Sequence, residues 1–291
     1  MRFAAGLSLL LLALGCDPDP VSEDAGARMD AGAGRDAGDD AAAPRDAGAA
    51  GDAATPDDAG TSVDAGPGDD AGPGSLSVLV FSKTTGFRHG SIGDGITALN
   101  ELAADRGWAI DDTEDASRIS TAGLADVDVL VFLSTTGDPL DDTQQAALEA
   151  WVRGGGGWVG IHAAADCEYG WPWYQELVGA WFARHPAIQD ATLEVEDRAH
   201  PTTAHLDATW MRNDEWYDFQ RNPRPFVDVL ITIDESTYSG ASMGADHPMT
   251  WLHEVDAGRS FYTAFGHTSA TYSEPEFRTM LAEAVEWAAG D

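Results

Sequence analysis

The sequence is poor in crosslinking groups, in positive charge and in long apolar segments. Its 291 residues include two cysteines and a single lysine, Lys83, and 16 basic side chains stand against 50 acidic ones. Cys167 is the only cysteine after Cys16, so residues 75–291 cannot form an internal disulfide. The acidic excess argues against nucleic acid and anionic lipid as ligands of the folded part, and it is compatible with a neutral ligand such as a sugar.

The most apolar stretch, residues 7–14, is too short to span a membrane stably as a helix. It follows Arg2 and ends in small residues, which predicts a secretory signal over residues 1–16. The segment LALGC resembles a bacterial lipoprotein signal, in which Cys16 carries the lipid, although Ala13 stands where such signals usually have leucine. Ordinary signal cleavage nearby, leaving Cys16 free, is the alternative.

Residues 17–74 contain no aromatic residue and are built mainly from Asp, Ala, Gly and Pro, with the triplet Asp-Ala-Gly recurring at irregular intervals. Such a segment cannot bury enough apolar surface to offset the entropy of ordering it, so we expect a disordered, self-repelling tether. Together with the signal, it predicts an exported domain that a lipid on Cys16 attaches to a membrane of the cell envelope. The sequence does not specify the oligomeric state.

Residues 75–291 hold all ten tryptophans and all eight histidines and have the length of one domain. Continuous apolar segments at 75–82, 127–134 and 157–162 alternate with helical patterns at 91–107, 141–155 and 171–182. Strand patterns then follow at 191–197, 215–219, 226–235, 249–255 and 259–266, the last two as a hairpin, and a helix is expected at 274–290. The expected fold is a three-layer α/β domain, with a parallel central sheet and a late antiparallel extension.

In open parallel sheets, ligands bind beyond the carboxyl ends of the strands. Polar residues that follow or face these ends, and that we expect to converge on one edge of the sheet, are His89, Thr135, Thr136, His162, His247 and His267. Each also has a structural explanation, because His89 can belong to a helix cap and the two threonines to a turn. Of the other histidines, we expect His200 and His205 in a surface loop, His253 in packing, and His185 between these cases.

The segment NDEWYDF places Asp214 and Glu215 beside Trp216 and Tyr217. Neighbouring residues of a strand point to opposite faces, so at most one carboxylate is expected to face a pocket, while the other is solvated or pairs with an arginine. Carboxylates near histidines suit acid/base catalysis or a divalent metal, although no tight metal-binding motif occurs. The two aromatic residues suit stacking on a sugar ring.

Several motifs, in their order along the chain, resemble those of the ThuA-like, or trehalose-utilisation, domain from about Val78 to the end. They are VLVFSKTTGFRHGSI, GGGWVGIHAAAD with YGWPWYQELVGAWF, HPTTAHL with NDEWYDF, and HPMTW with GRSFYTAFGHTS. The resemblance implies a flavodoxin-like fold, shared with the class I glutamine amidotransferases, and work on a disaccharide such as trehalose or its keto derivative. The motif positions that it implies here are His89, His162, Asp214, Glu215, His247 and His267.

The segment GGGGWVGIHAA has the pattern of a catalytic elbow in which Gly160 and Ile161 precede His162. In the related amidotransferases this step ends in the nucleophilic cysteine. An imidazole can act as acid, base, metal ligand or hydrogen-bond donor, but it does not replace a thiolate that forms a stable acyl intermediate. We therefore expect no glutamine hydrolysis, and we do not expect Cys167 to substitute as the nucleophile.

Three hypotheses follow. The first is an enzyme acting on a carbohydrate, with His162 as central acid/base and His89, His267 and one of Asp214 and Glu215 as its catalytic partners. In it, the residues expected to bind the substrate are Thr135, Thr136, His247, Trp216 and Tyr217. The second is a non-catalytic sugar-binding module, and the third is a domain with a structural divalent-metal site.

Overall fold

The central strands consist of apolar residues buried on both faces. β1 (Ser77–Phe81), β3 (Val129–Leu133) and β5 (Gly157–Ile161) have the sequences SVLVF, VLVFL and GWVGI, and all but the first residue of β1 are buried. Such runs are typical of parallel strands that helices cover on both sides. The computed structural model describes residues 75–290, so the predicted signal, the predicted lipidation site Cys16 and the predicted tether lie outside the described residues.

The other strands of the main sheet are β2 (Ala109–Thr113), β8 (Gln189–Val195), β9 (Thr209–Asp214), β11 (Asp228–Ile233), β12 (Pro248–Val255) and β13 (Gly258–Thr263). The sheet has nine strands in the order β2-β1-β3-β5-β13-β12-β11-β8-β9. The first five strands in this order pair in parallel, and the last four continue antiparallel. The α/β fold with a parallel sheet and an antiparallel extension is thus confirmed.

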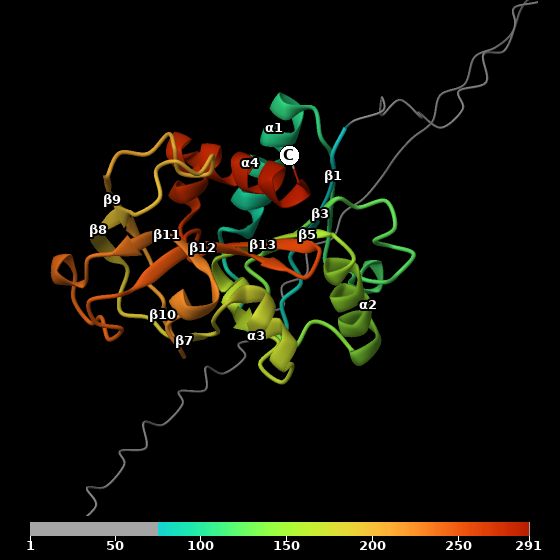
Figure 1. Ribbon diagram of the computed structural model, residues 1–291, viewed down its shortest axis with the longest axis horizontal. Helices are drawn as coiled ribbons and strands as arrows, with labels where there is room; N and C mark the ends of the chain where they lie inside the picture. The colour runs from blue at the N-terminus through green and yellow to red at the C-terminus, as the bar shows by residue number, and fades with distance from the viewer. Residues whose placement is uncertain (1–74, 291) are drawn as a thin grey trace, which may run out of the picture. The chain divides into compact units, whose positions relative to one another are not determined.

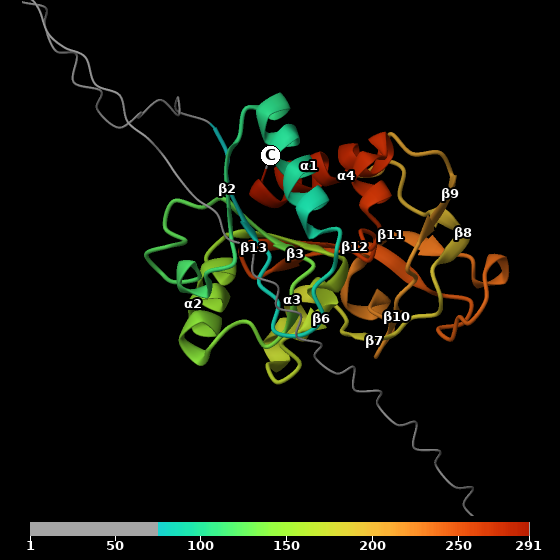
Figure 2. The same cartoon turned by 180° about the vertical axis from the view of Figure 1, so that it is seen from behind.

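Helices cover both faces of this sheet, as Figures 1 and 2 show. They are α1 (Ile92–Arg106), α2 (Asp142–Arg153), α3 (Pro172–Val178) and α4 (Pro275–Ala289). Helices α1 and α4 lie together on one face, where Arg106 pairs with Glu283 and Glu286, and α2 and α3 lie on the other. Within residues 75–290, no helix combines the length and the apolar character that crossing a membrane requires.

Local sequence signals explain where the helices begin and end. Asp141 caps α2 by accepting from the backbone N–H groups of Thr143 and Gln144, and the side-chain oxygen of Gln144 accepts from the backbone N–H of Asp141. Helix α1 ends at Gly107, whose φ of 77° lies in the left-handed region that glycine adopts without strain.

Three expectations about single elements were wrong. The segment 215–219 is not a continuous strand, because β9 ends at Asp214 and only β10 (Asp218–Phe219) pairs again, with β7 (Phe182–Arg184). Helix α3 stops at Val178 instead of reaching residue 182, because Gly179 has a φ of 89°. Strand β2 was missed because its sequence, AIDDT, is mostly exposed and acidic at the sheet edge. A further short pair joins β4 (Thr136–Gly137) and β6 (Asp166–Cys167).

Candidate functional site

His162 stands in a tight turn at the carboxyl end of β5. Its φ of 51° lies in the left-handed region, which is uncommon for a residue with a Cβ atom and recurs at functional sites. The side chain is fully buried, and its Nδ1 donates to the backbone carbonyl of Ala264 at 2.8 Å. Because Nδ1 carries the proton of this bond, Nε2 of the neutral ring keeps its lone pair.

The Nε2 atom of His162 belongs to a group that we call the cavity cluster, formed by His89, His162, Glu215 and His267. One ligand atom from each of the four lies within 4.8 Å of the others. His162 Nε2 is 3.3 Å from His267 Nδ1 and 3.5 Å from Glu215 Oε2, and the latter two atoms are 3.1 Å apart. The His89 ring lies edge-on to both other imidazoles. The fold therefore brings together these four of the predicted site residues.

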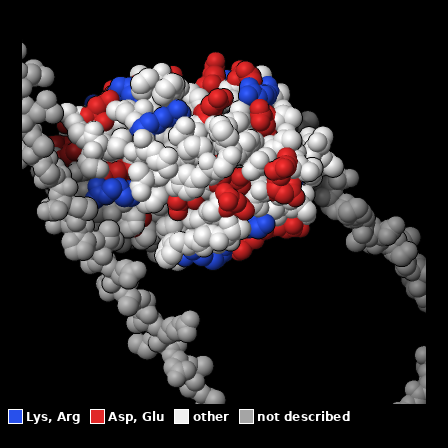
Figure 3. All heavy atoms as spheres, turned by 90° about the horizontal axis from the view of Figure 1, so that it is seen from below, with Lys and Arg blue, Asp and Glu red and all other residues white. Residues whose placement is uncertain are grey.

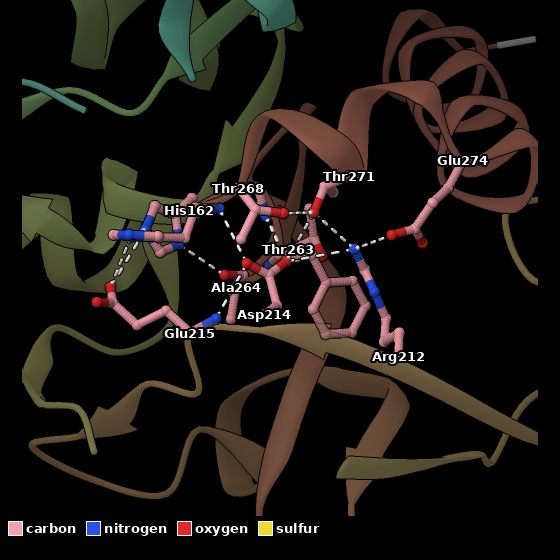
Figure 4. Close-up of polar contacts among 12 residues, drawn as sticks. His162, Arg212, Asp214, Glu215, Thr263, Ala264, Thr268, Thr271 and Glu274 are labelled. Atoms are coloured by element: carbon pink, nitrogen blue, oxygen red, sulfur yellow. Dashed lines mark hydrogen bonds and ion pairs between the residues drawn. The ribbon is translucent and has the colours of Figure 1, made fainter. Parts of the chain in front are cut away.

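Asp214 is the last residue of β9, and it fixes the backbone that carries two residues of the cavity cluster. Its fully buried carboxylate accepts hydrogen bonds from the backbone N–H groups of Glu215 (3.0 Å), Gly266 (3.0 Å) and His267 (3.2 Å). The buried guanidinium of Arg212 lies 3.3 Å from the same carboxylate, and Figure 4 shows Asp214 between Arg212 on one side and His162 and Glu215 on the other. Asp214 is thus a positioning residue, which corrects its placement among the catalytic candidates.

A cavity of about 290 Å³ opens next to the cavity cluster. Its walls consist of Phe87, His89, Asp166, Phe182, His185, Glu215, Tyr217 and His267. His162 is fully buried and is not part of the cavity wall, so it does not contact a sugar in the cavity directly. A larger hollow of about 550 Å³ lies along β8, β11 and the loop after β11, but its lining is acidic and includes no histidine or aromatic residue. We place the candidate site at the smaller cavity.

Burial and mutual contacts change the pKa values of the cluster. Burial alone would raise the pKa of Glu215, but the neighbouring imidazoles of His162 and His267 lower it to about 2. The same bond to Glu215 raises the pKa of His267. Burial, together with repulsion from the two neighbouring histidines, lowers the pKa of His89 to about 3. At neutral pH, Glu215 is therefore ionised and His89 is neutral.

Sequence reasoning missed several residues of the cavity wall, among them Asp166 and His185. His185 Nδ1 lies 3.0 Å from Glu215 Oε1, on the side of the carboxylate away from His162. Burial raises the pKa of Asp166, although the hydroxyl of Tyr169 donates to it at 2.6 Å. Asp166 had a usable signal, since it directly follows the elbow turn. His185 had no such signal in the sequence, because the short pairing of β7 with β10 places it in the cavity wall.

Three predicted substrate-binding residues are fully buried and are not part of the cavity wall: Thr135, Thr136 and Trp216. The hydroxyl of Thr135 contacts the sulfur of Cys167 at 3.3 Å, while Thr136 and Trp216 donate to backbone carbonyls. Tyr217, by contrast, lines the cavity, and its hydroxyl is 3.1 Å from His162 Nε2. These three residues are therefore corrected to packing roles, and Tyr217 keeps its place at the site.

His247 lies in a second group, which we call the closed cluster, with Asp218 and Glu235. Its Nε2 donates to the backbone carbonyl of Tyr217 at 2.8 Å, and its Nδ1 lies 3.0 Å from Glu235 Oε1. The ring is fully buried and is not part of the cavity wall. His247 supports the segment that carries Tyr217, which corrects the expectation that it meets the other histidines at one site.

The fold has relatives among solved structures. A ThuA-like protein from Bacteroides uniformis aligns with a TM-score of 0.64 and 24% identity over 73% of this chain and 91% of its own. A second, from Parabacteroides merdae, aligns with a TM-score of 0.63 and 21% identity over 74% of this chain and 90% of its own. These similarities establish the shared fold. No curated protein matches the sequence significantly.

The sequence itself identifies the family. Residues 77–288, which include all the described strands and nearly all of the described helical residues, match the sequence profile of the ThuA family, described as trehalose utilisation. The match contains the whole cavity cluster and every residue of the cavity wall. The chain therefore belongs to the ThuA, or trehalose-utilisation, family.

Proposed function

We propose that this domain binds a carbohydrate in the cavity and acts on it, with a disaccharide such as trehalose or its keto derivative as the substrate. The supporting observation is that three aromatic residues, Phe87, Phe182 and Tyr217, share one cavity wall with ionisable side chains. Aromatic rings pack against the apolar face of a sugar ring, while charged groups hydrogen-bond its hydroxyls. The trehalose-utilisation family supports this class of substrate.

The ionisable groups on the wall supply the acid/base chemistry. Asp166 is assigned as the general acid because its carboxyl group belongs to the cavity wall, where burial raises its pKa. His185, which is partly exposed beside Glu215, is positioned as the complementary base. His162 is assigned to orienting Glu215 and His267, since it lies behind the wall, and this replaces its expected role as central acid/base.

The same proposal assigns no glutaminase activity to the domain. The elbow carries a histidine, and Cys167 five residues later is buried among Thr135, Tyr174 and Ala164. Burial raises the pKa of the Cys167 thiol to about 12, so it does not form the thiolate that attack on an amide requires.

We further propose that the chain is exported and anchored by a lipid on Cys16, with residues 17–74 as the tether. The signal-like residues 1–16 and the acidic, aromatic-free segment support this. Incorporation of labelled palmitate in a bacterial host, lost in Cys16→Ser, tests the anchor.

The surface charge supports a neutral ligand. On the face in Figure 3, the acidic side chains of the described residues are scattered, and the basic side chains form no continuous patch. Such a face suits a neutral ligand better than a polyanion.

Incubation of the full chain with a panel of disaccharides and their 3-keto derivatives, followed by mass spectrometry, tests the reaction. We expect a product from at least one sugar, and a rate reduced by at least about 100-fold in Asp166→Asn. The control is His205→Gln, which removes an exposed histidine that bonds only the Glu276 carbonyl. Saturable binding without any product would instead make the domain a binding module.

A further inference from the structure

We propose that the cavity cluster is a binding site for one divalent transition-metal ion, held by His89, His162, Glu215 and His267. Three of its ligand atoms form a triangle with edges of 3.1, 3.3 and 3.5 Å. Zinc–nitrogen bonds of roughly 2.1 Å in a tetrahedron place neighbouring ligands about 3.4 Å apart. These three atoms thus already have the spacing of a tetrahedral metal site, and the fourth ligand atom, from His89, lies within 4.8 Å of them.

The ligand atoms are prepared for a cation. The bond from His162 Nδ1 to the Ala264 carbonyl leaves the Nε2 lone pair directed to the cluster, which is the arrangement typical of metal-binding histidines. The hydroxyl of Tyr217, 3.1 Å from Nε2, occupies that lone pair in the described structure, and an ion would take its place. On the other side, Glu215 Oε1 is held by His185, so Oε2 is the oxygen that remains for the metal.

The environment of the fourth ligand, His89, also favours a bound cation. His89 is buried, and its Nδ1 has no hydrogen-bond partner among the described residues. A buried polar nitrogen without a partner is costly, and the ring that carries it stands beside two other imidazoles, with one of its nitrogens within 4.8 Å of the cluster's other ligand atoms. One ion coordinated by all four groups gives the His89 ring a partner and compensates the negative charge of Glu215.

The donor set selects the class of ion. Three imidazole nitrogens and one carboxylate oxygen suit zinc and its first-row neighbours, whereas magnesium and calcium prefer sites made of oxygen alone. His89, Glu215 and His267 also form part of the cavity wall, so an ion there faces the cavity. A water molecule or a hydroxyl or carbonyl oxygen of a ligand can therefore approach the ion as a fifth ligand.

Metal titration of the full chain tests this site. After chelator treatment and dialysis, zinc is added in a calorimeter, and cobalt(II) is followed by its visible absorption, which is strong for a tetrahedral site. We expect one ion per chain, and affinity weakened by more than about tenfold in Glu215→Gln and in His267→Gln, whose side chain is partly exposed. The matched control, His205→Gln, changes an exposed histidine outside the cluster and should bind as the unchanged chain does.

Circular dichroism checks that each variant is folded. The proposal is wrong if no stoichiometric binding occurs, if folded Glu215→Gln and His267→Gln bind as tightly as the unchanged chain, or if binding is lost in His247→Gln instead. The carboxylates of residues 17–74 are present in every variant and in the control, so weak binding there cannot produce the expected difference. No sugar enters the assay, so its outcome is independent of the proposed carbohydrate activity.

Discussion

The cavity cluster and the closed cluster contain the same kinds of side chain but differ in what their histidines can still bind. In the cavity cluster, His162 Nδ1 is occupied by a carbonyl while Nε2 faces Glu215 and His267, next to an open cavity. In the closed cluster, both ring nitrogens of His247 are occupied, one by the Tyr217 carbonyl and the other by Glu235. His162 Nε2 also has a partner, the Tyr217 hydroxyl, but it lies next to an open cavity where a ligand can replace that hydroxyl, so histidines beside carboxylates mark a ligand site only where such an exchange is possible.

The two clusters are also linked. His247 holds the backbone of Tyr217, whose hydroxyl reaches His162, so the closed cluster supports one wall of the cavity. Because of this linkage, mutations in the two clusters should affect different properties, namely ligand binding and stability. Changes in the cavity cluster should alter binding, whereas changes in its supports should alter stability first.

Asp214→Ala should give the largest loss of stability. It removes the acceptor for three backbone N–H groups and leaves the buried Arg212 with Glu274, whose side chain is partly exposed, as its remaining carboxylate partner. Breaking a buried ion pair from one side costs about 3–5 kcal/mol of unfolding free energy, measured by urea denaturation. Glu196→Ala, which breaks an exposed pair with Arg224, should cost at most about 1 kcal/mol. Equal losses in the two variants would show that Asp214 does not anchor the cavity cluster.

Cys167, five residues after His162, is a further buried side chain near the elbow turn, and its reactivity can be compared between the folded and the unfolded chain. Alkylation requires the thiolate, and because burial raises the pKa of this thiol to about 12, it stays protonated at every lower pH. In Cys16→Ser, where Cys167 is the only thiol, iodoacetamide at pH 8 should react about a thousandfold more slowly with the folded chain than with the chain in urea. Native labelling within about tenfold of the unfolded rate would indicate an accessible, activated thiol.

His247→Gln and His267→Gln compare the two clusters directly. His247 is fully buried with both nitrogens occupied, so its loss should cost about 1–3 kcal/mol of unfolding free energy. His267 is partly exposed, so its loss should cost less than about 1 kcal/mol while weakening zinc binding. Urea denaturation and zinc titration of both variants measure this. The reverse pattern would exchange the roles assigned to the two clusters.

The sheet edge where the cavity cluster forms could be predicted from the sequence because strand direction fixes it. His89, His162 and His267 each follow a parallel strand of the sheet, and the carboxyl ends of such strands meet. The same rule placed His247 near that edge, but strand direction does not determine what folds over a side chain. Glu235 and Tyr238, from the segment after β11, both contact Nδ1 of the His247 ring.

The remaining wall of the cavity depends on contacts between distant segments. His185 and Phe182 reach the cavity wall through β7, which pairs with β10 at only two positions. This pairing is too short to produce a recognisable alternation of apolar and polar residues in the sequence. The division between Asp214 and Glu215 was predicted only as a choice, and the structure resolves it, with Glu215 in the cavity and Asp214 paired with Arg212. The nearby arginine two residues earlier was the available signal.

The smallest effect is expected at the mouth of the cavity. Phe87 is 66% exposed although it lines the cavity, so Phe87→Ala should change the unfolding free energy by less than about 0.5 kcal/mol. Loss of an aromatic contact with a sugar ring should weaken binding by about three- to tenfold, since such contacts contribute roughly 0.5–1.5 kcal/mol. Phe226→Ala removes a similarly exposed phenylalanine, 58% accessible and outside this cavity, and should leave sugar binding unchanged. Calorimetry with the best-bound disaccharide measures both variants, and an equal loss in the two would place the sugar away from the cavity cluster.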